Sequence, residues 1–188
     1  MSKEFRAGEK AETENDSDIL KVRGYAATFG SETVIGGAYK EVIERGAFTK
    51  AVKNDDVRFL VNHEGLPLAR TKSGTLKLSE DERGLFIEAD LDLNDPDVQK
   101  IASKMKRGDL DEMSFAFSPT VEEWDDSGSM PLRRLKEANL YDVAIVTYPA
   151  YNDTSIGIRS LNEFKKQKYS SQPVTAKMRM KLALADKL

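Results

Sequence analysis

Three residues in this chain have the side-chain types of a nucleophilic site, although they stand far apart in the sequence. His63 is the only histidine, Ser114 lies in DEMSFAFS, and Asp142 lies in NLYDVAIVTYPAY. A serine hydroxyl becomes a nucleophile when a histidine takes its proton and a carboxylate orients the histidine ring. Because such a triad is defined by its geometry, the residue types alone leave this chemistry as a hypothesis.

Each of the three residues also has a structural explanation. A lone histidine in a small domain is more often structural than catalytic, and a serine in a strand is usually a small polar residue. Asp142 stands in an apolar stretch, where an unpaired carboxylate is costly. It needs a partner, which is either His63 or an arginine such as Arg133 or Arg134.

The composition excludes several other kinds of chemistry. The chain of 188 residues has no cysteine, so disulfides, thiol catalysis and cysteine-bound metals are excluded. It has no Walker A loop, GxGxxG turn, GxSxG elbow or HExxH motif. We therefore expect no cofactor and no metal. The net charge of −3 does not favour nucleic-acid binding, and no apolar run is long enough for a membrane span or a secretory signal.

The residues before His63 predict a strand that would carry the histidine at its end. The stretch DVRFLVNH (56–63) is rich in Val, Phe and Leu. With a period of two, one face would hold Val57, Phe59, Val61 and His63. The following residues, EGLPLART, predict a loop because they contain Gly65 and Pro67.

The other two candidate residues also fall in predicted strands. Around Ser114, Phe115 and Phe117 would point one way, whereas Ser114, Ala116 and Ser118 would point the other. A face of small residues lets another chain approach the backbone closely. The strand around Asp142 would place its carboxylate on one face with Ala144 and Val146.

The remaining pattern predicts a mostly β (α+β) fold. Alternating runs at 74–79 and 84–91 flank the polar turn EDER and predict a hairpin. Residues 94–108 predict a helix with Asn94 or Asp95 as its cap, Pro96 in its first turn and Gly108 at its end. A second short helix is expected from Ala47. In total we expect about seven strands and two or three helices, which indicates a β-barrel-like or α+β domain.

Charge divides the chain into three parts. Residues 1–18 form a polar N-terminal segment with three basic and six acidic groups, in which EFR could pair as a short edge strand. Residues 19–160 form the expected domain. Residues 161–188 form a basic tail with seven basic and two acidic groups.

Six sequence blocks, in order, resemble the HK97-type prohead (capsid maturation) serine proteases of tailed bacteriophages. Together they cover roughly residues 20–160. The blocks are GYAATFG (24–30), EVIERGAF (41–48), VRFLVNHE (57–64), LSEDERGLFIEADL (78–91), MKRGDLDEMSFAF (105–117) and NLYDVAIVTYPAYNDT (139–154). The family is similar in fold to the herpesvirus assemblin proteases, which implies a β-barrel of about seven strands with a few surrounding helices.

The resemblance implies a role for each candidate residue. Ser114 would be the nucleophile, His63 the general base and Asp142 the acidic residue that orients the ring. The family more often has Glu at the third position, and Asp is one methylene shorter, so its strand must approach His63 more closely or the ring must tilt. The chain also has Arg45 where the family usually has Pro, and Ala144 where Ser is common.

The resemblance further implies a serine endopeptidase that acts in capsid maturation. Its substrates would be the scaffold, or the scaffold-like segment of the major capsid protein, and the protease itself. It would act as a homo-oligomer inside the assembling prohead in the host bacterial cytoplasm, without cofactor, nucleic acid or membrane. The basic tail would be a targeting arm, a self-cleaved segment or a flexible end. One alternative is a non-catalytic capsid assembly or scaffolding protein with the same fold; another is an unrelated β-barrel binding module.

Overall fold

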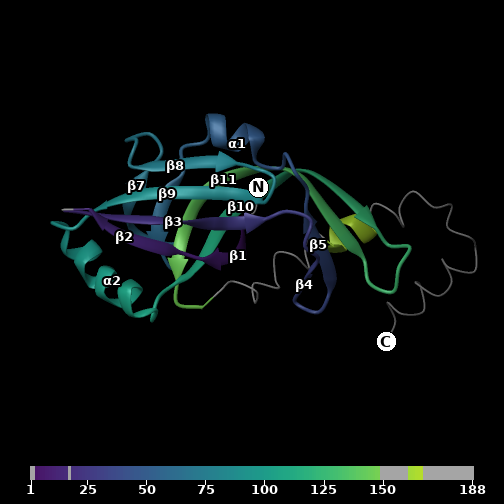
Figure 1. Cartoon of the computed structure of the whole chain (residues 1–188). Coiled ribbons are helices and arrows are strands. Elements are labelled where there is room, and N and C mark those ends of the chain that lie inside the picture. The colour runs from purple at the N-terminus through teal and green to yellow at the C-terminus, as the bar shows by residue number, and fades with distance from the viewer. Residues whose placement is uncertain (1–2, 17, 149–160, 167–188) are drawn as a thin grey trace, which may run out of the picture.

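The computed structural model describes residues 3–16, 18–148 and 161–166. Over these ranges the chain is mostly β, which confirms the predicted mostly β class but not the β-barrel that the resemblance implied (Figure 1). The elements are, in order, β1 (Glu4–Lys10), β2 (Glu12–Asp16), β3 (Ile19–Thr28), β4 (Thr33–Ile35), β5 (Tyr39–Ile43), α1 (Thr49–Asn54), β6 (Arg58–Val61), β7 (Glu64–Arg70), β8 (Leu76–Glu80), β9 (Gly84–Asp92), α2 (Pro96–Arg107), β10 (Glu112–Asp125) and β11 (Leu132–Val146).

The described strands form two sheets. The larger has the order β1-β10-β11-β5-β4, with β6 beside β11 and β7 beside β6. The smaller has the order β2-β3-β9-β8. No closed barrel is found among the described residues, because these paths end at β1 and β4 in one sheet and at β2 and β8 in the other. The expected count of about seven strands is too low, since strands such as β2 and β7 come from segments predicted as a polar segment and a loop.

Strand β11 is long enough to hold two separate parallel neighbours. Its first part, Leu132–Leu135, pairs with β5, and its last part, Asp142–Ile145, pairs with β6. Its other edge pairs with β10 along most of its length, and this long hairpin reaches from the body of the molecule toward β4 and β5 (Figure 1). The candidate residues Ser114 and Asp142 therefore lie on two adjacent strands in the interior of the larger sheet.

One hydrophobic core joins the two sheets and both labelled helices. Its buried members include Val22 and Ile87 from the smaller sheet, Phe115 and Val143 from the larger sheet, and Ile101 from α2. Burying each large apolar side chain stabilises the fold by roughly 1.5–3 kcal/mol. The strands that carry Ser114 and Asp142 are thus rigid supports.

Helix α2 confirms the predicted helix and both of its ends. The Asp95 carboxylate accepts a hydrogen bond of 2.8 Å from the backbone N–H of Asp97, and Pro96 occupies the first turn. Gly108 ends the helix with a φ of 76°. That left-handed conformation suits glycine because it has no Cβ. Local sequence signals therefore determine this element.

The predicted hairpin is present as β8 and β9, and its second strand begins at a glycine that has no room for a side chain. A Cβ added at Gly84 would lie 1.9 Å from the carbonyl oxygen of Ala27 on β3. We expect Gly84→Ala to lower the free energy of unfolding by about 1–3 kcal/mol, because the paired strands must separate. Urea denaturation measures this effect.

Gly128→Ala is the matched control for this change. A Cβ at Gly128 would lie 3.7 Å from its nearest neighbour, an ordinary contact. We expect a change within about 0.5 kcal/mol for this variant. Equal midpoints for Gly84→Ala and the wild type would contradict the close approach of β3 and β9.

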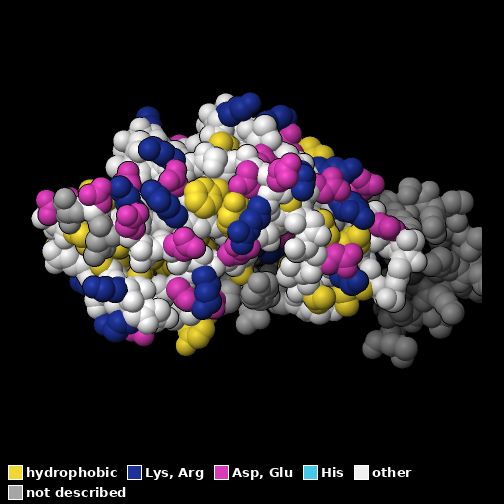
Figure 2. Space-filling model, in the orientation of Figure 1, with side chains coloured by type: hydrophobic (Ala, Val, Ile, Leu, Met, Phe, Trp, Pro, Cys, Tyr) yellow, Lys and Arg dark blue, Asp and Glu magenta, His cyan; other side chains and the backbone are white. Residues whose placement is uncertain are grey.

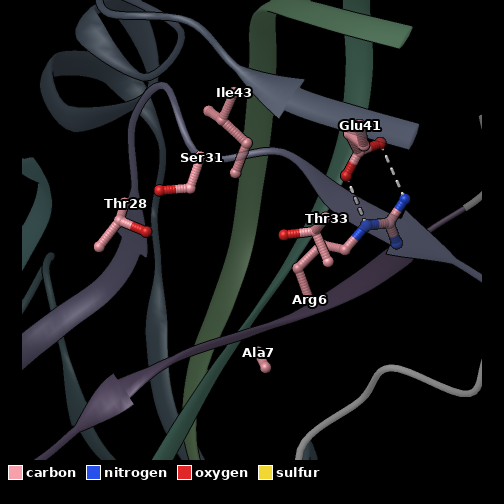
Figure 3. Close-up of a pocket in the computed structure, with 7 residues that line it drawn as sticks. All are labelled: Arg6, Ala7, Thr28, Ser31, Thr33, Glu41 and Ile43. Carbon is pink, nitrogen blue, oxygen red and sulfur yellow. Dashed lines mark hydrogen bonds and ion pairs between the residues drawn. The ribbon is translucent and has the colours of Figure 1, made fainter. Parts of the chain in front are cut away.

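Strand β1 is held to the larger sheet by buried ion pairs. The Arg6 guanidinium donates to both oxygens of Glu41 at 2.5 and 3.0 Å (Figure 3). It also donates to Glu4 at 2.7 Å. The fully buried Arg133 on β11 donates to Glu4 at 2.7 and 2.9 Å and to Glu41 at 2.9 Å. We call Glu4, Arg6, Glu41 and Arg133 the buried charge network. It links β1, β5 and β11.

The environment of this network shifts the pKa values of its members and neighbours. Burial acts to raise the pKa of Glu4, but the hydrogen bond and charge of Arg133, together with the charge of Arg6, outweigh it and lower the pKa below 4.5. Burial raises the pKa of Tyr39, whose hydroxyl accepts a hydrogen bond from Arg6, to about 12. Glu4 is therefore charged, and Tyr39 protonated, near neutral pH.

A small cavity borders the Arg6–Glu41 pair on the side of β3 and β4. It has a volume of about 40 Å³ and is also lined by Thr28, Ser31 and Thr33 (Figure 3). Ligand sites usually have volumes of about 300–1,000 Å³. This cavity is therefore too small to receive a peptide.

Parts of the predicted outer segments pack against the sheets. Strand β1 pairs with β10, as the pattern EFR suggested, and β2 pairs with β3. Residues 161–166, the start of the predicted basic tail, form a short helix in which Phe164 stacks on Trp124 at 5.4 Å. The rest of that tail lies outside the described residues, and the division into three parts stays a prediction.

One face of the molecule and the described helices can be compared with the expectations from charge and hydropathy. Acidic and basic side chains are interspersed over the face shown in Figure 2. Within the described ranges, no helix has the length and apolar character needed to cross a bilayer.

Candidate active site

Ser114 lies in the interior of the larger sheet, where small residues flank it on both sides. Strand β10 pairs with β1 and with β11, and the partners of Ser114 are Ala7 and Ala144. The serine is fully buried. The small-residue face predicted around Ser114 thus lies between two close neighbouring strands.

Asp142 is brought close to Ser114 by the pairing of β10 with β11. Ser114 lies opposite Ala144, and Asp142 lies opposite Ala116, two positions further along. Residues on one face at such diagonal positions are about 7–8 Å apart at their Cα atoms. This gap suits an imidazole ring, which can contact both side chains at once.

His63 supplies that ring from a tight turn, not from a strand. Strand β6 ends at Val61, and the next two residues, Asn62 and His63, have φ values of 51° and 61°. The prediction that His63 continues the face of Val57, Phe59 and Val61 is therefore wrong. The predicted loop after it is also wrong, since residues 64–70 form β7 and fold back on β6.

Asn62 attaches this turn to the end of β11. Its backbone N–H donates to the carbonyl of Ile145 at 3.0 Å, and its side-chain oxygen accepts from the backbone N–H of Thr147 at 2.8 Å. Asparagine tolerates the left-handed conformation better than most residues. The sequence reasoning missed this residue, although an asparagine directly before the histidine was a signal for such a turn.

The three candidate side chains form one continuous chain of contacts. His63 Nδ1 lies 2.5 Å from Asp142 Oδ1, and His63 Nε2 lies 2.7 Å from Ser114 Oγ. Asp142 is buried, and the His63 side chain is 10% exposed. In the tautomer in which Nδ1–H donates to Asp142, Nε2 is free to accept a proton from the serine hydroxyl.

Lys3 and the first residues of β1, which follow it, contact all three candidate side chains. Lys3 Nζ lies 2.5 Å from Asp142 Oδ2, and the Phe5 ring lies 4.5 Å from the His63 ring. The Arg6 carbonyl lies 2.8 Å from Ser114 Oγ. Because the hydroxyl has one proton, it donates at any moment either to this carbonyl or to His63. The sequence reasoning did not place β1 at the site.

The arginines considered as partners for Asp142 have other partners. Arg133 belongs to the buried charge network, and Arg134 lies 3.7 Å from Glu44.

This geometry can perform general-base activation of a hydroxyl. A base within about 2.6–3.2 Å of the proton it removes meets the distance requirement, and His63 meets it for Ser114. A carboxylate on the other ring nitrogen fixes the tautomer and stabilises the imidazolium that forms. These distances are the ones that a Ser–His–Asp nucleophilic site requires.

Comparisons with known proteins identify the family of the chain. The chain is 27% identical over 156 residues to the prohead protease of Escherichia phage T5, with 80% of this chain and 69% of that protein covered. It is 28% identical over 139 residues to the prohead protease of Enterobacteria phage HK97, with 71% and 57% covered. No solved structure matches the chain significantly. Residues 6–168 match the sequence model of the family described as Caudovirus prohead serine protease, so the chain belongs to this family.

Proposed function

We propose that this chain is the serine endopeptidase of prohead maturation, with Ser114 as nucleophile, His63 as general base and Asp142 as the residue that orients His63. The observation that carries the proposal is the position of the imidazole between Asp142 Oδ1 at 2.5 Å and Ser114 Oγ at 2.7 Å. These contacts join three segments that are distant in sequence. Membership of the prohead serine protease family supports the same assignment.

The reaction follows from the contacts of the three residues. Ser114 Oγ attacks the carbonyl carbon of the scissile peptide while His63 Nε2 takes the hydroxyl proton. His63 then gives that proton to the leaving amine as the C–N bond breaks, which leaves an ester on Ser114. Water, activated by the same ring, hydrolyses the ester. Asp142 holds the ring through Nδ1 during both steps.

The burial of Ser114 limits the direction from which a substrate can approach it. Ser114 is fully buried, whereas His63 is partly exposed, so a peptide must reach the serine from the side of His63. Neighbouring groups must move apart to admit it.

The proposed substrates are the proteins of the immature head. They are the scaffold, or the scaffold-like segment of the major capsid protein, and the protease itself. The proposed place of action is the interior of the assembling prohead within the host bacterial cytoplasm, where the enzyme works as a homo-oligomer. The relatives named prohead protease support this assignment.

Co-expression of the full chain with the major capsid protein of the same phage tests the proposal. We expect the intact mass of the capsid protein to fall in the presence of the wild type and to stay full length with His63→Ala, because the only base is then missing. Glu64→Ala is the matched control, since Glu64 is the exposed neighbour of His63, and it should process the capsid protein normally.

Either of two outcomes would contradict the proposal. Equal processing by the wild type and His63→Ala would show that another enzyme makes the cut. A full-length capsid protein in every sample would favour the alternative of a non-catalytic assembly protein.

A further inference from the structure

Asp142 uses its two carboxylate oxygens for two different partners. Oδ1 lies against His63 Nδ1, and Oδ2 lies 2.5 Å from the ammonium of Lys3. Lys3 and Asp142 are 139 residues apart in the sequence. A carboxylate this deeply buried is costly without a compensating charge, and His63 is neutral when it acts as a base. Lys3 supplies the charge.

Lys3 is held in this position by the strand that follows it. Strand β1 pairs with β10 from Glu4 opposite Phe117 to Ala7 opposite Ser114, and the buried charge network anchors Glu4 and Arg6. The Lys3 ammonium also lies 5.3 Å from the centre of the Phe5 ring, and Phe5 packs on His63. The contact with Asp142 is therefore a fixed part of the site.

We infer that Lys3 is a positioning residue for the His63–Asp142 pair. It holds one carboxylate oxygen so that the other faces the imidazole, and its positive charge makes the imidazolium less stable than it would be beside Asp142 alone. The effect on catalysis rests on the proposed function, whereas the effect on the protonation of His63 does not. Lys3 touches neither the substrate nor the serine in this scheme, and it acts through Asp142.

The other charged groups around the pair are already engaged or face away. Asp142 approaches His63 from β11, and Ser114 approaches it from β10. On β6, Arg58 is the register partner of Asp142, but its guanidinium lies 3.4 Å from the Asp56 carboxylate. That carboxylate also pairs with Arg70 of β7. Glu64, the residue after His63, is exposed. Among the described residues, Lys3 is thus the cation paired with the buried carboxylate.

The consequence is a shift in the pH at which His63 takes up a proton. A positive charge paired with the carboxylate that faces the ring disfavours the imidazolium. Removing that charge makes the imidazolium more stable. The midpoint of the His63 titration should therefore be higher in Lys3→Met than in the wild type.

Nuclear magnetic resonance titration of the imidazole signals tests this inference on the full chain. His63 is the only histidine, so its ring signals are unambiguous. We expect a higher midpoint for Lys3→Met and an unchanged midpoint for Lys3→Arg, which keeps the charge. Lys10→Met is the matched control, because Lys10 stands at the other end of β1, is 74% exposed and pairs with Asp111. It should titrate as the wild type does.

Processing of the capsid protein by the same variants gives the second measurement. We expect Lys3→Met to slow it about 10- to 100-fold, because the ring is less well oriented, and Lys3→Arg to restore most of the rate. Because Lys3 is 38% exposed, we expect each variant to fold. In an Asp142→Asn background, Lys3→Met should not lower the rate of processing further, since its effect on ring orientation acts through the carboxylate.

The inference is overturned if Lys3→Met and the wild type titrate alike, or if Lys3→Arg behaves like Lys3→Met. In those cases the contact only helps to attach β1. Failure of the proposed function looks different, because the titration would still shift in Lys3→Met while His63→Ala processed the capsid protein normally.

Discussion

Replacing Ser114 by alanine is expected to lower the rate of capsid processing by about 10⁴- to 10⁶-fold. The change removes the single oxygen that attacks the scissile carbonyl, and no other hydroxyl lies within hydrogen-bonding distance of His63 Nε2 among the described residues. The fold should remain, because serine and alanine differ by one atom and the site is formed by strands on both sides. Processing is measured from the mass of the capsid protein over time, and folding from the urea midpoint.

Ser118→Ala is the matched control for this experiment. Ser118 is buried on the same strand and on the same face as Ser114, but its hydroxyl lies 3.0 Å from the Tyr141 hydroxyl and does not contact His63. The same atom is removed in both variants, so a general weakening of β10 should affect both. We expect Ser118→Ala to process the capsid protein at close to the normal rate. Normal processing by Ser114→Ala would overturn the assignment of the nucleophile.

Replacing Arg133 by methionine is expected to lower the free energy of unfolding by about 3–5 kcal/mol. Arg133 is fully buried and makes four hydrogen bonds to the carboxylates of Glu4, Glu41 and Glu122. Methionine occupies a similar volume but leaves the two buried carboxylates with Arg6 as their remaining cation. Urea or thermal denaturation of the purified chain measures the loss.

Arg134→Met is the matched control, since the two arginines are adjacent on β11. Arg134 is 42% exposed and lies 3.7 Å from Glu44. Exposed pairs of this kind contribute about 0–1 kcal/mol. A similar loss of stability in both variants would show that the β11 backbone, and not the buried charge network, accounts for the effect.

The loss of stability in Arg133→Met is also expected to depend on pH. The pKa of Glu4 is lowered in the folded chain, so the stability that its ionised form contributes is present above the pKa of the unfolded chain. That contribution is lost as the pH falls through the folded-state pKa. The stability difference between the wild type and Arg133→Met should therefore be largest near neutral pH and should narrow in acid.

Local sequence signals were sufficient for the elements that form from their own residues. The helix α2 carries its cap, its proline and its final glycine in the sequence, and the hairpin of β8 and β9 carries its turn between two alternating runs. The strands around Ser114 and Asp142 were also predictable, because their apolar residues alternate with small or polar ones. These patterns follow from the side-chain periods of helices and strands, which are the same in every fold.

The sequence by itself also determined which residue types were available for catalysis. With one histidine and no cysteine, only His63 could serve as a histidine base. The patterns around Ser114 and Asp142 made them candidates, and the resemblance to prohead proteases implied a role for each. What residue spacing could not decide was the geometry. The register of β10 on β11 places the carboxylate two positions from the serine, and one step of slip would turn it to the other face.

Only the tertiary structure decided how His63 enters the site and what lies behind Asp142. The left-handed turn at Asn62 and His63 exists because β7 folds back on β6 and because Asn62 bonds to β11. Lys3 reaches Asp142 only because β1 pairs with β10 from the opposite end of the chain. Such contacts depend on which strands become neighbours, and that choice is made by burial of the shared core, which no short stretch of sequence encodes.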